Sequence, residues 1–139
     1  IHVRRNPYVV FRSTQRLYET GILPTGLQKA PPMEQAIDGI LRRYQEMYDT
    51  FFEERALIPA GHYTELAFED VEQDMVGAVA RAYEAVGIDG YAQLEPKLKA
   101  FAESQKDYQK NKHPQIEETL RRRIYATWQR AFDEFGYPA

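Results

Sequence analysis

Apolar residues recur at helical spacing over much of the chain. The clearest case is residues 33–55, where apolar positions follow a three-four alternation and predict a long amphipathic helix. The same pattern predicts helices over residues 7–18, 72–86 and 91–106, and a last helix from Pro114 to the glycine at position 136. The chain is therefore expected to be mostly helical.

Two short stretches predict strands, residues 1–5 and residues 62–68. Asn6 is a favoured helix N-cap and Pro7 a favoured first helical residue, so the first strand should lead directly into a helix. Strands separated by helices predict parallel pairing and a three-layer α/β fold. Because a parallel sheet rarely consists of two strands, we expect further strands before Ile1 and interpret the chain as a fragment.

Residues 21–32 hold Gly21, Pro24, Gly26, Pro31 and Pro32, and predict an unusually long loop. Loops of this length without structure of their own tend to be lids or binding segments. Elsewhere the aromatic positions Tyr44, Tyr48, Phe51, Trp128, Phe132 and Phe135 lie on helical stripes and are expected in the core.

The composition limits the possible chemistry. With 139 residues, 43% hydrophobic and 13% aromatic, the chain is expected to form one ordered domain. The absence of Cys excludes disulfides, thiolate zinc sites, iron–sulfur clusters and cysteine nucleophiles, and three histidines make a histidine-rich metal centre a poor expectation. We expect no bound metal, no membrane span, no signal peptide and a cytoplasmic location.

Positive charge is concentrated near the first strand-to-helix turn. The whole chain has a net charge of −3, yet its first 20 residues carry Arg4, Arg5, Arg12 and Arg16 against Glu19, a local charge of +3. Free N–H groups and the helix dipole at such a turn favour an anion, and open α/β sheets bind ligands at this edge. The acidic remainder argues against nucleic-acid binding.

Arg5 and Ser13 are the candidates for binding this anion. Ser13 follows Asn6 by seven residues, close to two helical turns, so its hydroxyl should fall on the side of the cap. A guanidinium and a hydroxyl on one face would make a phosphate clamp. Arg4, Arg12 and Arg16 are expected to be surface charges, with one of them at the border of the site as the alternative. Asp70 is expected to be a helix cap and Glu69 a structural partner.

Residues 3–14, VRRNPYVVFRST, resemble the 3′-phosphate-binding motif of sulfotransferases that use 3′-phosphoadenosine 5′-phosphosulfate (PAPS). In that family a strand-end Arg, a Pro two positions later and a helical Ser eight positions after the Arg recur, as Arg5, Pro7 and Ser13 do here. The resemblance implies that Arg5 and Ser13 bind the 3′-phosphate of PAPS, and of the product adenosine 3′,5′-bisphosphate (PAP).

Two further stretches resemble bacterial members of the family. One is residues 63–71, YTELAFEDV, with the later pair Gly87-Ile88; the other is residues 108–113, YQKNKH, ahead of the helix that ends at Phe135-Gly136-Tyr137. Lys110, Asn111 and Lys112 are further candidates for donor binding as a lid over the nucleotide, although a solvated turn is the simpler interpretation.

The resemblance also implies parts that the sequence does not contain. The family's P-loop-like 5′-phosphosulfate loop and its catalytic Lys have no counterpart here, and the catalytic base is not assigned. Residues 1–139 are therefore interpreted as the C-terminal part of a single sulfotransferase domain with a P-loop-like fold. The acceptor, a small molecule, carbohydrate, lipid or peptide, should depend on loops such as residues 21–32. A P-loop kinase-like transferase and a non-enzymatic helical interaction module remain the alternatives.

Overall fold

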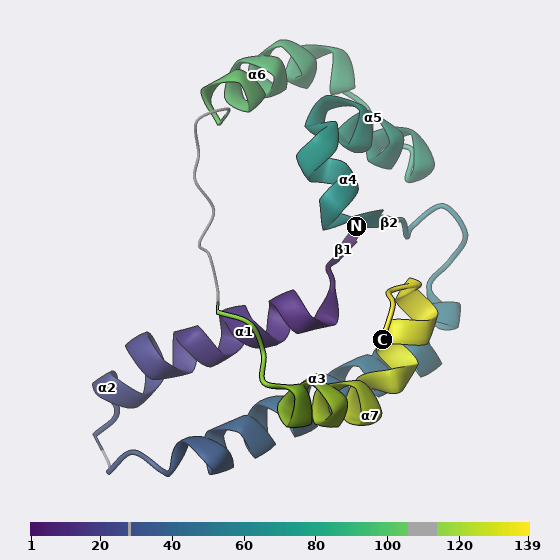
Figure 1. Cartoon of the computed structure of the whole chain (residues 1–139). Coiled ribbons are helices and arrows are strands. Elements are labelled where there is room, and N and C mark those ends of the chain that lie inside the picture. The colour runs from purple at the N-terminus through teal and green to yellow at the C-terminus, as the bar shows by residue number, and fades with distance from the viewer. Residues whose placement is uncertain (28, 106–113) are drawn as a thin grey trace. The chain divides into compact units, whose positions relative to one another are not determined.

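The computed structural model describes residues 1–27, 29–105 and 114–139. These form two units, each described by itself. The first unit comprises Ile1–Arg5 and the described part of Ala56–Asn111, and the second comprises Asn6–Arg55 and the described part of Lys112–Ala139. The described residues are mostly helical, with a small parallel sheet (Figure 1).

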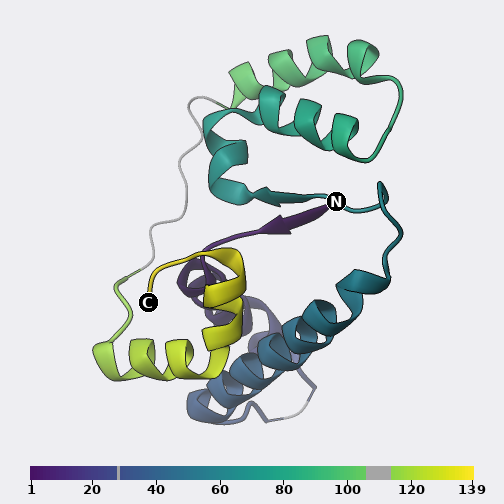
Figure 2. The same ribbon diagram turned by 90° about the vertical axis from the view of Figure 1, so that its right-hand side faces the viewer.

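The sheet of the first unit consists of β1 (His2–Arg4) and β2 (Glu65–Ala67). The two strands are parallel, with His2 opposite Glu65 and Arg4 opposite Ala67, and they lie side by side in Figure 2. The prediction of parallel pairing is confirmed, although both strands are shorter than expected. The part of the chain that the structure describes thus contains one pair of strands, and the predicted three-layer sheet is not tested by it.

The helix predicted over residues 72–86 is confirmed over residues 75–85, but it begins later than expected and a separate short helix precedes it. α4 (Phe68–Gln73) directly follows β2, and α5 (Met75–Ala85) begins after Asp74, whose backbone is non-helical at φ −144° and ψ 78°. The Asp74 carboxylate accepts a hydrogen bond of 2.8 Å from the Gly77 N–H and caps α5. Asp70, the expected cap, lies inside the first turn of α4, where the helix dipole favours its negative charge.

α6 (Tyr91–Ser104) packs beside α5 (Figure 2). The Tyr91 hydroxyl donates to the Val76 carbonyl oxygen at 2.9 Å, and the Tyr91 ring meets the Tyr83 ring edge-on, with 5.5 Å between centroids. α6 has no fully buried residue, and Phe101 is exposed. The apolar positions of α6 are therefore only partly covered by the described residues.

Three helices enclose the core of the second unit: α1 (Pro7–Leu17), α3 (Met33–Glu54) and α7 (Glu118–Phe135). Phe11 and Phe132 are completely buried. The Trp128 indole N–H donates to the Leu41 carbonyl oxygen at 2.9 Å, and its ring stacks on Tyr44 at 3.8 Å between centroids. The prediction that the aromatic stripes form a core is confirmed.

Ion pairs along the outside show that α3 and α7 run in the same direction. The pairs are Glu34 with Arg123, Asp49 with Arg130 and Arg55 with Glu134. Their positions rise together along both helices, so the two helices run in the same direction. α7 is also kinked at its buried tryptophan, where φ is −107° and ψ is 16° (Figure 2).

The loop predicted over residues 21–32 begins later than expected. A π-helical turn, η1 (Tyr18–Ile22), and a short helix, α2 (Leu23–Thr25), continue from α1. The Thr20 and Thr25 hydroxyls donate to carbonyl oxygens one turn back, at 2.8 and 2.7 Å, and Pro24 occupies a first-turn position that needs no N–H donor. The helical run therefore continues past Gly21 to Thr25.

Two boundaries differ from the sequence pattern. α7 begins at Glu118, not Pro114, because the Glu117 carboxylate caps it through the N–H groups of Thr119 and Leu120, at 3.0 and 3.3 Å. α3 is followed by a short 3₁₀ turn, η2 (Arg55–Leu57). The predicted helix stop is confirmed at Gly136, whose φ of +71° suits glycine.

Candidate functional site

Arg5 lies immediately after β1, in the first unit. Its guanidinium carbon sits 4.1 Å from the centroid of the Phe68 ring, and Nη2 is 4.0 Å from the Glu72 carboxylate. Both partners belong to α4. The side chain is nevertheless 36% exposed, so the ring orients the guanidinium while part of its donor surface faces solvent. Arg5 can therefore bind an anion at the carboxyl end of β1.

Arg4, the preceding arginine, has a different environment. Its Nε lies 3.0 Å from the Glu65 carboxylate, which also interacts with the His2 imidazole at 3.0 Å and accepts a hydrogen bond from the Tyr63 hydroxyl at 2.9 Å. This cluster joins β1 to β2. The sequence predicted Arg4 to be a surface charge. In the structure Arg4 instead has a structural partner in Glu65.

Ser13 lies on α1, in the second unit. α1 begins as predicted, because the Asn6 side chain accepts a hydrogen bond of 2.9 Å from the Tyr8 N–H and Pro7 follows the cap. Ser13 is exposed, and its hydroxyl has no hydrogen-bond partner within the described residues. Arg5 and Ser13 belong to different units, so their joint binding of one phosphate stays a prediction.

The other candidates for donor binding, Lys110, Asn111 and Lys112, lie outside the described residues. No helix in the ranges that the structure describes is long and apolar enough to cross a membrane. Across the same ranges, no group of three or more His, Asp or Glu side chains is arranged to hold a metal ion.

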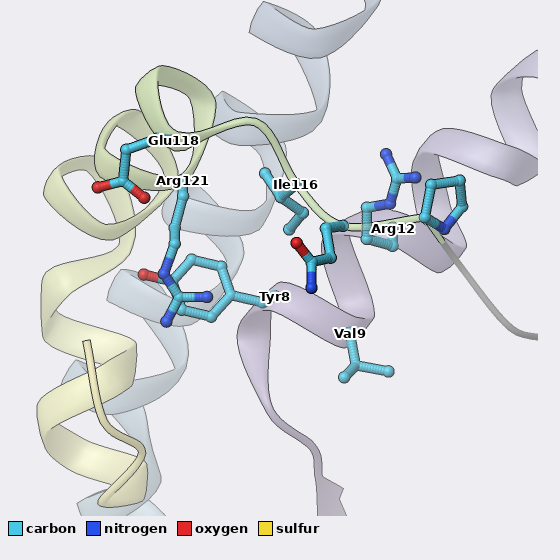
Figure 3. Close-up of a pocket in the computed structure, with 8 residues that line it drawn as sticks. Tyr8, Val9, Arg12, Ile116, Glu118 and Arg121 are labelled. Atoms are coloured by element: carbon cyan, nitrogen blue, oxygen red, sulfur yellow. The ribbon is translucent and has the colours of Figure 1, made fainter.

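A pocket of about 480 Å³ lies between α1 and the start of α7, within the second unit (Figure 3). Its lining residues are Tyr8, Val9, Arg12, Pro114, Gln115, Ile116, Glu118 and Arg121. Sequence analysis did not predict this pocket. One signal was available in the sequence. Arg12, one of the four clustered arginines, follows Tyr8 by four residues, so the two side chains lie on the same face of α1.

One side of this pocket is formed by Arg121 stacked on Tyr8 (Figure 3). The guanidinium carbon is 3.9 Å from the ring centroid, and Nη2 donates to the Ala139 carbonyl oxygen at 2.8 Å. Burial raises the pKa of the Tyr8 phenol, an effect that the nearby Arg121 charge partly offsets. Tyr8 is therefore a neutral, well-packed platform under a cation.

Arg12 lies on the other side of the pocket. Its Nη1 donates to the Gln15 side-chain oxygen at 3.1 Å. Its Nε is buried and has no hydrogen-bond partner in the described part of the chain. Native proteins rarely leave such a donor unpaired, because it loses water without gaining an acceptor.

Comparison with known proteins connects these features to a family. A family model described as "Sulfotransferase family" matches residues 1–93, which include β1, α1, β2 and α4. The chain is 29% identical over 137 residues to omega-hydroxy-beta-dihydromenaquinone-9 sulfotransferase Stf3 from Mycobacterium bovis and from Mycobacterium tuberculosis. Each alignment covers 99% of this chain and 35% of the relative, so the chain spans about a third of the length of these curated relatives. No solved structure matched the chain.

Proposed function

Because the chain belongs to the sulfotransferase family, we propose that it is the C-terminal part of a sulfotransferase domain that transfers a sulfuryl group from PAPS to a hydroxyl or amine. In this proposal the chain carries the 3′-phosphate-binding half of the donor site. The P-loop-like fold and the 5′-phosphosulfate loop belong to the part of such a domain that would precede residue 1.

The environment of Arg5 is the observation that carries this proposal. The Phe68 ring and the Glu72 carboxylate orient a guanidinium at the carboxyl end of β1, and the side chain remains 36% exposed. A planar guanidinium donates two parallel hydrogen bonds to a phosphate, which makes it a specific ligand as well as a charge. Ser13 supplies an exposed hydroxyl on α1 and matches the family spacing.

In this role Arg5 and Ser13 act by binding and not by chemistry. Sulfuryl transfer resembles phosphoryl transfer: the acceptor oxygen or nitrogen attacks in line, its bond to sulfur forms, and the bond from sulfur to the phosphate oxygen breaks. Catalysis of such a step rests on positioning and on neutralising the leaving phosphate. The 3′-phosphate is remote from the sulfur, so its binding energy serves to orient the donor.

We propose an apolar acceptor with a hydroxyl group. The two relatives are named for action on omega-hydroxy-beta-dihydromenaquinone-9, whose name describes a hydroxylated lipid-like molecule. In this chain Leu17, Ile22 and Leu27 are exposed in the segment that runs from the end of α1 past α2. Apolar side chains gathered on one short exposed segment suit an apolar ligand better than a sugar.

The alternatives make different predictions for nucleotide binding. Thermal unfolding of the complete protein should shift upward with PAP and not with Mg–ATP, because only PAP carries a 3′-phosphate. The converse result would favour a kinase-like transferase, and no response to either would favour a helical interaction module. Transfer of radiolabelled sulfate from PAPS to an omega-hydroxylated menaquinone then tests the reaction itself.

A further inference from the structure

The pocket between α1 and the start of α7 is positively charged. Arg12 and Arg121 line it from two helices. Its acidic lining residue is Glu118, which interacts with Arg122 at 2.9 Å. The carboxylate charge is thereby balanced by a cation outside the lining, and the two arginines leave the pocket with an excess of positive charge.

A chain of side chains on α1 orients Arg12. The Gln15 oxygen accepts from Arg12, and the Gln15 nitrogen donates to the Glu19 carboxylate at 2.9 Å. The guanidinium is thus held in one place while its buried Nε remains without an acceptor among the described residues. A guanidinium held at the wall of a cavity is an oriented cationic donor for an anion that enters the cavity.

The rest of the pocket is suited to an organic ligand. Val9 and Ile116 contribute apolar surface, and the Tyr8 ring stacks against Arg121 (Figure 3). The volume of about 480 Å³ lies within the range of roughly 300–1,000 Å³ that holds small organic molecules and far exceeds one inorganic ion. The pocket has an arginine on either side and apolar surface between them. Such a lining suits an organic anion with an apolar or flat body.

We propose that this pocket binds a phosphate or sulfate monoester of an organic molecule, with Arg12 and Arg121 as its anion ligands. Two sources share this chemistry. One is the nucleotide, because Ser13 lies one turn beyond Val9 on the same side of α1. The other is the sulfated product of the acceptor. Assigning either source rests on the proposed function, whereas the anion site rests on the pocket alone.

The test is calorimetric titration of the complete protein with two probes, PAP and 4-nitrophenyl sulfate. Arg12→Gln and Arg121→Gln should each weaken at least one probe about tenfold or more, the effect of losing a hydrogen bond to a charged group. Arg16→Gln is the matched control, because it removes the same charge from α1 at a position outside the lining. It should change neither affinity more than about twofold, since a distant exposed charge is screened.

The pattern across probes identifies the source. If the variants lose affinity for PAP alone, the pocket binds the nucleotide. If they lose affinity for 4-nitrophenyl sulfate alone, the pocket binds the sulfated product. If both pocket variants unfold at the wild-type temperature and bind both probes as the wild type does, the site does not exist. Should Arg12→Gln fail to fold, Arg121→Gln decides the question, and unchanged binding of both probes by that folded variant overturns the proposal. Sulfuryl transfer from PAPS is measured in a separate assay. Failure of the proposed anion site is therefore distinguishable from failure of the proposed sulfotransferase function.

Discussion

Replacing Arg5 by Ala should weaken PAP binding far more than it lowers stability. The contacts that Arg5 makes within its own unit are a stack on Phe68 at 4.1 Å and a 4.0 Å approach to Glu72. A cation–π contact at an exposed site contributes about 0.5–1 kcal/mol, and a surface ion pair about 0–1 kcal/mol. The free energy of unfolding should therefore fall by no more than about 2 kcal/mol.

The effect on binding should be larger, because the lost bonds join two charged groups. One hydrogen bond of this kind contributes about 1.5–3 kcal/mol. Loss of one such bond raises the dissociation constant of PAP roughly 10- to 150-fold. Titration calorimetry on the complete protein measures the affinity, and urea unfolding of the same preparation measures the stability.

Arg4→Ala is the matched control for this experiment. It removes the same charge one residue away, but Arg4 interacts with the Glu65 carboxylate at 3.0 Å and belongs to the cluster that joins the strands. We expect a loss of stability and a change in PAP affinity of less than about threefold, the size of a screened charge effect. Equal PAP affinity in the wild type and in folded Arg5→Ala would refute the donor-site assignment.

Three further predictions concern separate parts of the chain. Ser13→Ala should weaken PAP binding severalfold in titration calorimetry and leave stability within about 0.5 kcal/mol, since the side chain is exposed; unchanged affinity would remove Ser13 from the donor site. Trp128→Ala should lower the free energy of unfolding by about 3–5 kcal/mol in urea, because it empties the centre of the core and removes the indole hydrogen bond to the Leu41 carbonyl oxygen; a loss below about 1 kcal/mol would contradict the packing described. Hydrogen bonds from the Thr119 N–H and hydroxyl lower the pKa of Glu117, so its capping contribution is present above the ordinary Glu pKa of about 4.3 and is lost as the pH falls through the lower folded value. Thermal unfolding of Glu117→Gln should accordingly depend less on pH in the acidic range than that of the wild type, and identical acid profiles would contradict the cap.

Local chemistry predicted the start of α1 and the end of α7 correctly. Asn6 and Pro7 specify a helix start through a side-chain acceptor and a fixed φ, and Gly136 permits the left-handed stop. The division between α4 and α5 was missed, because the predicted helix start was placed at residue 72, ahead of the capping residue Asp74. The Asp74 carboxylate accepts from the Gly77 N–H and fixes the start of α5 at Met75.

The sequence predicts the Arg5 site better than the pocket between α1 and α7. Arg5 was identified because its position depends on neighbours in the chain: a strand, a turn and a helix start. The pocket containing Arg12 and Arg121 was missed, because these residues lie at opposite ends of the sequence and meet only when α7 packs on α1. Arg12 was accordingly assigned to the surface, whereas its Nε is buried.

Sequence patterns predicted the helical character, the parallel pairing of two strands, the basic turn at the first helix and the resemblance to sulfotransferases. Each depends on the order and spacing of residues or on a short motif. Three features required the folded chain: Arg4 joins the strands through Glu65, Arg5 is stacked on Phe68, and α1 and α7 enclose a cationic pocket. These features depend on which side chains from distant segments pack together when the chain folds. Local propensity describes only neighbours in the sequence and does not predict such contacts.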